Sequence, residues 1–480
     1  MSSIKHKTIY SLKWSALEKI GQFSIQFIIS VILARLLGPE EYAIVGVLNI
    51  FVVISSVFVD AGFSQGLIRK LDCNADDYNS VFWFNLFSSI LLYIVLFFLM
   101  PVIADIFKDS NLIETGRVLM LIIPLQALNV VQTTIVNKKL QFKRIAKYTL
   151  VVTPIAGVIG VLIAYNGLGV WALIIQTLVY TLLISLVFWI KSDWRPKLRF
   201  KIQPIIELFS FSFKLFISSL LNSLFNNIYS IIIAKLYPKI QFGYFSQAQK
   251  YATLPTNLFE SILNRMTYPI LATLQNDVGF YRNTYIKMQM TMFAFFVPFM
   301  LTLTLCGREG VILILGDNWE PSILFFQILC IGGITLPFHP LAMSTLKVFG
   351  KSSLILNLEI IKKMLIIISI IVSLSWGVIG LVCGQVIYLW IVLVINLYYC
   401  GKQIGYSLKE QVKDIYPYVI VAFIAIVISL ISTYFIINML ILLLVKIVFF
   451  VGTYFLCVYT IKIRQFTIIN DIIRQNLKWL

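Results

Sequence analysis

The stretch VILARLLGPEEYAIVGVLNIF, residues 31 to 51, joins an apolar run that ends near Arg35 to a second apolar run that continues to Asp60. Two hundred positions later the chain reads IIIAKLYPKIQFGYFSQAQKY, which aligns with the first stretch without a gap. Arg35 aligns with Lys235, and Asp60 with Glu260, so the charge signs repeat together with the apolar pattern. The chain therefore contains an internal duplication that twice places a cation and a carboxylate in apolar surroundings.

The composition defines the broad class. The 480 residues are 59% hydrophobic and 12% charged, whereas an ordinary soluble domain is about 25% charged. A bilayer core needs roughly 20 apolar residues per helical span, because backbone groups in lipid must be satisfied within the segment. The six cysteines are scattered without metal-ligand spacing or paired motifs. These features predict an all-α polytopic membrane protein with no large soluble domain.

The apolar runs predict about fourteen transmembrane helices. The N-terminal run is interrupted by Glu18 and lacks a small-residue cleavage site, so we interpret it as a retained first span. The expected spans lie near residues 14–37, 42–66, 80–104, 117–137, 145–165, 169–190, 205–236, 242–270, 288–306, 320–345, 355–376, 378–400, 415–437 and 439–461.

Lysine and arginine alternate between the connections of these spans. One set of connections contains 26 of the 39 basic residues, and the other set contains 4. Cytoplasmic loops collect Lys and Arg, so this contrast supports fourteen spans with both termini in the cytoplasm. The basic loops are explained by topology and by attraction to anionic lipid, and no nucleic-acid partner is expected.

The duplication predicts the domain organisation. The two copies lie six spans apart and cross the membrane in the same direction, which is typical of two lobes in parallel repeat with a binding site at their interface. We expect an N-terminal six-helix lobe over residues 1–190 and a basic cytoplasmic linker over 191–204. A second six-helix lobe over 205–400, two extra helices over 415–461 and a cytoplasmic tail over 462–480 complete the chain.

The stretch ARLLGPEEYAIVGVLNIF, which follows an N-terminal basic helix, and the segment DAGFSQGLIRK at the end of the second span resemble the polysaccharide-transport branch of the MOP superfamily. The resemblance is to Wzx-type oligosaccharide flippases of the colanic-acid-exporter-like group, and it is strongest over residues 10 to 200. It implies an inner-membrane carrier that moves undecaprenyl-diphosphate-linked oligosaccharide to the periplasmic leaflet by alternating access. It also implies that a polysaccharide polymerase and chain-length machinery are partners of the carrier.

Charged residues inside the predicted spans are the candidate site. Nine cations and five carboxylates fall within or at the margins of the spans, although a charge at the centre of a span costs about 2.5 to 3.5 kcal/mol. An excess of cations suits a diphosphate and an anionic glycan. Snorkelling to the interface is the competing explanation for the cations nearest helix ends, Arg35 and Lys235. The candidate substrate-binding residues are Arg35, Lys214, Lys235, Lys250, Arg265, Lys362 and Lys363.

Four carboxylates are candidates for structural pairing or for ion coupling, namely Glu18, Asp60, Glu260 and Glu359. Asp60 could pair with a cation, cap a helix break near Gly62, or take a proton or sodium ion. Glu359 lies three and four positions before two lysines, which favours a cluster on one helical face. His339 stands between two prolines and is a possible proton site, although packing beside a kink explains it as well. Proton or sodium coupling is the one cofactor requirement considered, and no metal is expected.

Two other functions remain open. A multidrug-type cation-coupled exporter of the same superfamily predicts an acidic cavity and twelve spans. A polymerase or glycosyltransferase of the same pathway predicts a longer loop with exposed carboxylates. The segment GKSS at residues 350–353 has Thr345 where a phosphate-binding loop needs its first glycine. We therefore expect a transporter rather than an enzyme.

Overall fold

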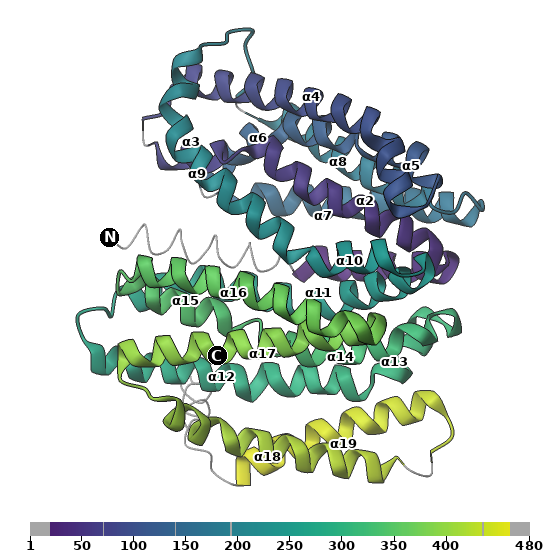
Figure 1. The fold of residues 1–480 in the computed structure, drawn as a ribbon, viewed down its shortest axis with the longest axis vertical. Coiled ribbons are helices and arrows are strands. Elements are labelled where there is room, and N and C mark those ends of the chain that lie inside the picture. Colours follow the sequence, from purple (N-terminus) through teal and green to yellow (C-terminus); the bar gives the residue numbers. More distant parts are fainter. Residues whose placement is uncertain (1–19, 71, 140, 193, 434–435, 461–480) are drawn as a thin grey trace. The chain divides into compact units, whose positions relative to one another are not determined.

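The computed structural model describes residues 20–460 except 71, 140, 193, 434 and 435. Every regular element among these residues is a helix, and Figure 1 shows long helices packed side by side within each part of the chain. The prediction of an all-α polytopic membrane protein is confirmed. Glu18 and the predicted C-terminal tail lie outside the described residues.

The chain divides into two compact units, Met1–Ser246 and Gln247–Leu480. This division does not test the lobe and linker boundaries expected from the sequence, which remain a prediction. In the first unit, α4 packs on α6, α6 on α8, and α8 on α7. The helices of this unit are Ile20–Leu36, α2 (Pro39–Asp60), α3 (Phe63–Arg69), α4 (Ala75–Phe107), α5 (Asn111–Leu119), α6 (Ile122–Lys138), α7 (Phe142–Tyr165), α8 (Trp171–Lys191), α9 (Ile202–Asn226), α10 (Ile228–Leu236) and the start of α11 (Lys239–Ala272).

The second unit has its own core, in which Tyr285, Phe338 and Tyr454 are buried. Helices α12, α15, α17, α18 and α19 supply most of this core. The helices after α11 are α12 (Val278–Leu305), α13 (Gly307–Leu315), η1 (Asp317–Ser322), α14 (Ile323–Gly333), α15 (Phe338–Val348), α16 (Ser352–Ser373), η2 (Leu374–Trp376), α17 (Gly377–Ile404), α18 (Leu408–Ser432) and α19 (Met439–Thr460).

Within the described ranges, eleven helical segments are long and apolar enough to cross a membrane. One of them, Ser352–Ile404, is 53 residues long and contains both α16 and α17. The shorter apolar helix Ile20–Leu36 and the more polar α11 correspond to two further predicted spans. The count of fourteen crossings therefore remains a prediction.

The turn at the centre of the duplicated stretch has the same backbone in both copies. The first copy stops at Leu36 and restarts at Pro39, and the second stops at Leu236 and restarts at Lys239. The N–H of Leu37 donates to the carbonyl of Leu33 at 2.9 Å, and Tyr237 repeats this bond to Ile233 at 3.1 Å. The repeat read from the sequence is thus also a repeat of structure.

The first copy is capped by its own side chain. Glu41 accepts a hydrogen bond from the N–H of Gly38 at 3.0 Å, which satisfies a helix N-terminal donor. The second copy has Gln241 at the position of Glu41. Two carboxylates in the first turn of α2 also favour its N-terminus through the helix dipole.

Several predicted spans are divided by breaks. Ala61 and Gly62 adopt left-handed conformations and separate α2 from α3. Two features require glycine at position 62. Its φ is +76°, and an added Cβ would lie 2.5 Å from the carbonyl oxygen of Ser212. The predicted span 205–236 also divides, at Asn227, whose side chain donates to the carbonyl of Ser223 at 2.8 Å.

Candidate functional site

The two copies of the duplicated hairpin contact each other directly inside the first unit. An added Cβ on Gly46 would lie 2.9 Å from the ring of Phe242, and one on Gly243 would lie 1.9 Å from the carbonyl oxygen of Pro39. Phe242 is buried. Small residues therefore allow the N-terminal turns of α2 and α11 to approach at backbone distance.

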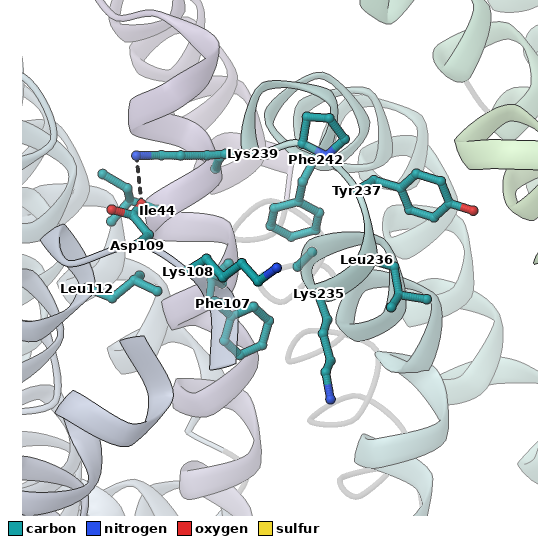
Figure 2. Close-up of a pocket in the computed structure, with 14 residues that line it drawn as sticks. Ile44, Phe107, Lys108, Asp109, Leu112, Lys235, Leu236, Tyr237, Lys239 and Phe242 are labelled. Carbon is teal, nitrogen blue, oxygen red and sulfur yellow. Dashed lines mark ion pairs between the residues drawn. The ribbon is translucent and has the colours of Figure 1, made fainter. Parts of the chain in front are cut away.

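A cavity of about 360 Å³ lies beside this contact, between α2, the end of α4, and the second hairpin. Figure 2 shows apolar side chains such as Ile44, Phe107 and Phe242 around it, with lysines from two different segments. The lining residues are Ala43, Ile44, Val47, Phe107, Lys108, Asp109, Leu112, Ala234, Lys235, Leu236, Tyr237, Pro238, Lys239 and Phe242. We refer to this space as the hairpin cavity.

One ion pair joins the second hairpin to the turn between α4 and α5. Lys239 Nζ lies 2.7 Å from Asp109 Oδ2, and Figure 2 shows the Lys239 side chain extending toward that carboxylate. Lys239 also lines a neighbouring cavity of about 760 Å³, together with Glu40, Glu114 and Trp171. The ion pair therefore lies between the hairpin cavity, which lysines line, and a second cavity, which Glu40 and Glu114 line.

The duplicated cations occupy equivalent places. Arg35 lies in the last turn of the helix Ile20–Leu36, and Lys235 lies in the last turn of α10. Both side chains are exposed, while the residues before them, Ala34 and Ala234, are buried. Lys235 lines the hairpin cavity, and Arg35 is not among its lining residues.

The other predicted cations are spread along the chain. Lys214 is exposed on α9, and Lys250 is exposed on α11. Arg265 belongs to α11 by its backbone, and its side chain lies outside what the structure describes. Lys214 lies in the first unit, and Lys250 and Arg265 lie in the second.

The carboxylates that align in the repeat differ in their surroundings. Asp60 Oδ1 accepts a hydrogen bond from the N–H of Ser64 at 3.1 Å, so it caps the start of α3 beside Gly62. This is one of the three roles that the sequence left open for Asp60. Glu260 is half-buried in the uninterrupted helix α11.

A polar cluster occupies the second unit around α16. Lys362 is buried, and its Nζ lies 2.8 Å from Glu359 Oε1, as the spacing predicted. Lys363 is half-buried on the same helix. His339 Nδ1 lies 2.9 Å from Asn396 Nδ2, and its buried Nε2 has no hydrogen-bond partner among the residues described.

Sequence reasoning missed a second buried ion pair. Lys446 Nζ on α19 lies 2.8 Å from Glu309 Oε1 on α13, with exposed side-chain fractions of 12% and 4%. The available signal was Lys446 itself, a lysine in an otherwise apolar span, which required a partner. Lys108 and Lys239 lie in connections between predicted spans, and no short sequence pattern indicates that they line one cavity.

A cluster of charged residues lies at the end of the first unit away from the hairpin cavity. Lys70 Nζ lies 2.9 Å from Asp77 Oδ1 and 3.1 Å from Glu207 Oε2. The hydrogen bond to Asp77 raises the pKa of the Lys70 ammonium above its usual 10.5, against a smaller lowering effect of burial. Lys138 Nζ donates to the carbonyl of Leu67 at 2.9 Å and caps the end of α3.

Taken together, these features define a class: a multi-pass helical membrane protein built on a duplicated hairpin, with cations at the contact between the copies. The chain belongs to the polysaccharide biosynthesis protein family, whose pattern matches residues 32–324, more than half of its length. The matched region includes both copies of the hairpin. The resemblance noted in the sequence is therefore confirmed.

Two bacterial proteins are similar to most of this chain. An uncharacterized membrane protein in the cps region of Klebsiella pneumoniae is 24% identical over 393 residues, which covers 80% of each chain. The lipopolysaccharide biosynthesis protein WzxC of Escherichia coli is 20% identical over 424 residues, covering 86% of this chain and 85% of its own.

The fold has a solved counterpart. The lipid II flippase MurJ in an inward closed conformation superposes with a TM-score of 0.69. The alignment covers 95% of this chain and 98% of that one at 16% sequence identity. At this identity the likeness establishes a shared fold.

Proposed function

We propose that this protein moves lipid-linked anionic oligosaccharide units from the cytoplasmic to the periplasmic leaflet of a bacterial inner membrane, for assembly of a surface polysaccharide. One observation carries the proposal. The family match spans both copies of the hairpin, and where the copies meet, lysines from two segments face an apolar-walled cavity. Cations in such surroundings attract phosphate and carboxylate groups strongly.

Movement by alternating access is part of the proposal. The contact of Gly243 with Pro39 holds the N-terminal turns of α2 and α11 together at the end that the charge pattern predicts to face outward. Opening that contact would release cargo to the outer side. A carrier of this kind transports its substrate unchanged, so we propose no enzymatic step and expect a polymerase with chain-length machinery to use the product.

Proton coupling at His339 is the proposed energy input. The Asn396 side-chain amide nitrogen lies 2.9 Å from His339 Nδ1, and the buried Nε2 has no hydrogen-bond partner among the described residues. Histidine acts as a proton shuttle in proteins because its imidazole can gain and lose a proton. Sodium coupling through Asp60 or Glu260 is the alternative, and measuring transport with each gradient alone decides between them.

The test is a deletion in the bacterium that carries the gene. Loss of the protein should abolish the surface polysaccharide and leave lipid-linked intermediate in the inner leaflet, and the wild-type gene should restore export. Arg35→Glu with Lys250→Glu should insert into the membrane normally and fail to restore it. Lys409→Glu, an exposed lysine on α18 in a predicted cytoplasmic connection, is the matched control and should restore it. Normal export by the doubly reversed variant contradicts a cationic path.

The orientation has its own test. Cysteine placed at Lys201 should react with a membrane-impermeant reagent only after the inner membrane is opened, because this residue belongs to the predicted cytoplasmic linker. Cysteine at Asn111, an exposed residue that lines the cavity next to the hairpin cavity, should react in intact spheroplasts. The reverse pattern would invert the proposed direction of transport.

A further inference from the structure

The hairpin cavity contains more positive than negative charge. Three lysines and one aspartate line it, and the aspartate is already paired with Lys239 at 2.7 Å. Among the described residues, the ammonium groups of Lys108 and Lys235 have no carboxylate within ion-pair distance. The cavity therefore presents two exposed ammonium groups that form no ion pair with a carboxylate in the described part of the chain.

Lys108 occupies a backbone position that a lysine seldom takes. Its φ is +54°, and it is one of two non-glycine residues with positive φ in the part of the chain that the structure describes. This is the left-handed position that ends α4, where glycine is usual because it has no Cβ. A lysine at this position is strained, and such strained conformations cluster at functional sites, so a strained residue that lines a cavity points to a role for its side chain.

The turn that holds Lys108 is well fixed. The N–H of Lys108 donates to the carbonyl of Asp105 at 3.3 Å, and the N–H of Asp109 donates to the carbonyl of Ala104 at 3.0 Å. Figure 2 shows Lys108 extending in the direction opposite to Lys239, toward the helix that carries Lys235. The two lysines thus come from a fixed turn and from a helix end, on neighbouring segments.

The walls of the cavity explain why it suits one kind of anion. Ile44, Phe107 and Phe242 provide apolar surface next to the ammonium groups. A volume of about 360 Å³ is in the range of small-molecule sites. A phosphate or diphosphate attached to a hydrocarbon chain matches both features, since it carries multiple negative charges beside an apolar portion.

We propose that the hairpin cavity is a binding site for the phosphate group of a lipid. Lys108 and Lys235 bind the phosphate, and Asp109 keeps Lys239 from binding it by forming an ion pair with that lysine. The proposal rests on the proposed function, because it names the chemistry that the carrier meets at its predicted outward end. The phosphate has two sources, the diphosphate of the lipid-linked substrate and the headgroup of an anionic phospholipid.

Binding is measured on the full chain in nanodiscs of phosphatidylcholine, by native mass spectrometry at increasing amounts of added lipid. The probes are undecaprenyl diphosphate, phosphatidylglycerol and uncharged undecaprenol. The double variant Lys108→Gln with Lys235→Gln should lose about tenfold in affinity for a phosphate-bearing probe. Lys409→Gln, an exposed lysine elsewhere, is the matched control and should bind like the wild type.

A second variant predicts a change of opposite sign. Asp109→Asn releases Lys239 and preserves an oxygen that can accept the hydrogen bond that Asp109 Oδ1 receives from the N–H of Asn111. It should bind the same probe about threefold more tightly. Equal binding by the double variant, the aspartate variant and the wild type overturns the site.

The probes separate the two sources. Loss of undecaprenyl diphosphate binding with unchanged phosphatidylglycerol binding assigns the cavity to the substrate, and equal loss of both assigns it to phosphate lipids in general. Undecaprenol binding should not change in any variant, and a tenfold loss of undecaprenol in the double variant overturns phosphate recognition.

The results that would refute the proposed function differ from those that would refute the phosphate site. Wild-type protein that binds undecaprenyl diphosphate through these lysines and yet is dispensable for surface polysaccharide keeps the site and refutes the transport role. Conversely, a protein essential for export whose double variant binds all probes normally keeps the transport role and refutes this site.

Discussion

The Cβ position of Gly243 lies 1.9 Å from the carbonyl oxygen of Pro39, so the two copies of the duplicated hairpin touch where a side chain has no room. Gly243→Ala must therefore push α2 and the start of α11 apart. We expect a loss of about 1 to 3 kcal/mol of stability from this overpacking. Thermal unfolding of the purified protein in detergent measures it.

The control for this prediction is Gly452→Ala on α19, where an added Cβ meets no atom within 4 Å. Alanine has the higher helix propensity, so this variant should keep or slightly raise the melting temperature. Equal melting of the two variants would mean that the hairpins are less tightly packed than the structure has them.

Gly62, in the break between α2 and α3, can be compared with Gly167, in the turn between α7 and α8. Gly62 and Gly167 both have φ of +76°, but an added Cβ at Gly62 meets the Ser212 carbonyl at 2.5 Å and one at Gly167 meets nothing within 4 Å. Gly167→Ala should cost the backbone strain alone, about 1 to 2 kcal/mol. Gly62→Ala should cost about 1 to 3 kcal/mol more, because the clash adds to the strain. A denaturation series that ranks the two equally would remove the role of Ser212.

The buried pair of Lys446 and Glu309 predicts a strongly non-additive mutant cycle. Lys446→Met or Glu309→Met alone should destabilise the protein by about 3 to 5 kcal/mol, since each leaves one buried charge without its partner. The double Met variant should recover most of that loss, because it removes both charges. Unfolding free energies of the four proteins give the coupling directly.

An exposed pair on the same part of the chain serves as the reference. Arg308 and Glu320 are 3.8 Å apart with exposed fractions of 64% and 61%. Arg308→Ala should change stability by less than about 1 kcal/mol. A cost as large as that of Lys446→Met would show that exposure does not separate the two pairs.

Lys70 gives a prediction for pH. Its folded pKa is raised above 10.5 by Asp77, so the pair contributes its full stability below 10.5 and loses it as the pH rises through the folded value. The difference in melting temperature between wild type and Lys70→Met should stay constant from about pH 7 to about pH 9.5 and shrink at higher pH. A difference that shrinks near neutrality would assign the effect to another group.

Much of the helical framework could be predicted from the sequence, because apolar runs and the repeat are local or self-comparing signals. The turn at Leu36 and Pro39 reappears at Leu236 and Lys239 with the same hydrogen bond, as the ungapped alignment indicates. The ion pair of Glu359 and Lys362 follows from helical spacing alone. Each of these features depends on residues that are near in sequence or related by the duplication.

The rest depends on packing, which a single sequence does not encode in any short pattern. Glu309 and Lys446 are far apart in the chain, and helix rotation decides that they meet. Asp60 had three chemically reasonable roles, and only the left-handed break at Gly62 selects helix capping in the described structure. Lys108 is an ordinary loop lysine in the sequence, because its backbone conformation is invisible there.

The two copies of the duplicated stretch differ in whether the helix after the turn is broken. The first copy is interrupted at Ala61 and Gly62, whereas the equivalent positions, 261 and 262, lie within the unbroken α11. The first copy can therefore bend at Ala61 and Gly62 without breaking a helical hydrogen-bond ladder, whereas the second would have to break one to bend at the same place. The same duplicated sequence thus gives one copy a hinge position that the other lacks.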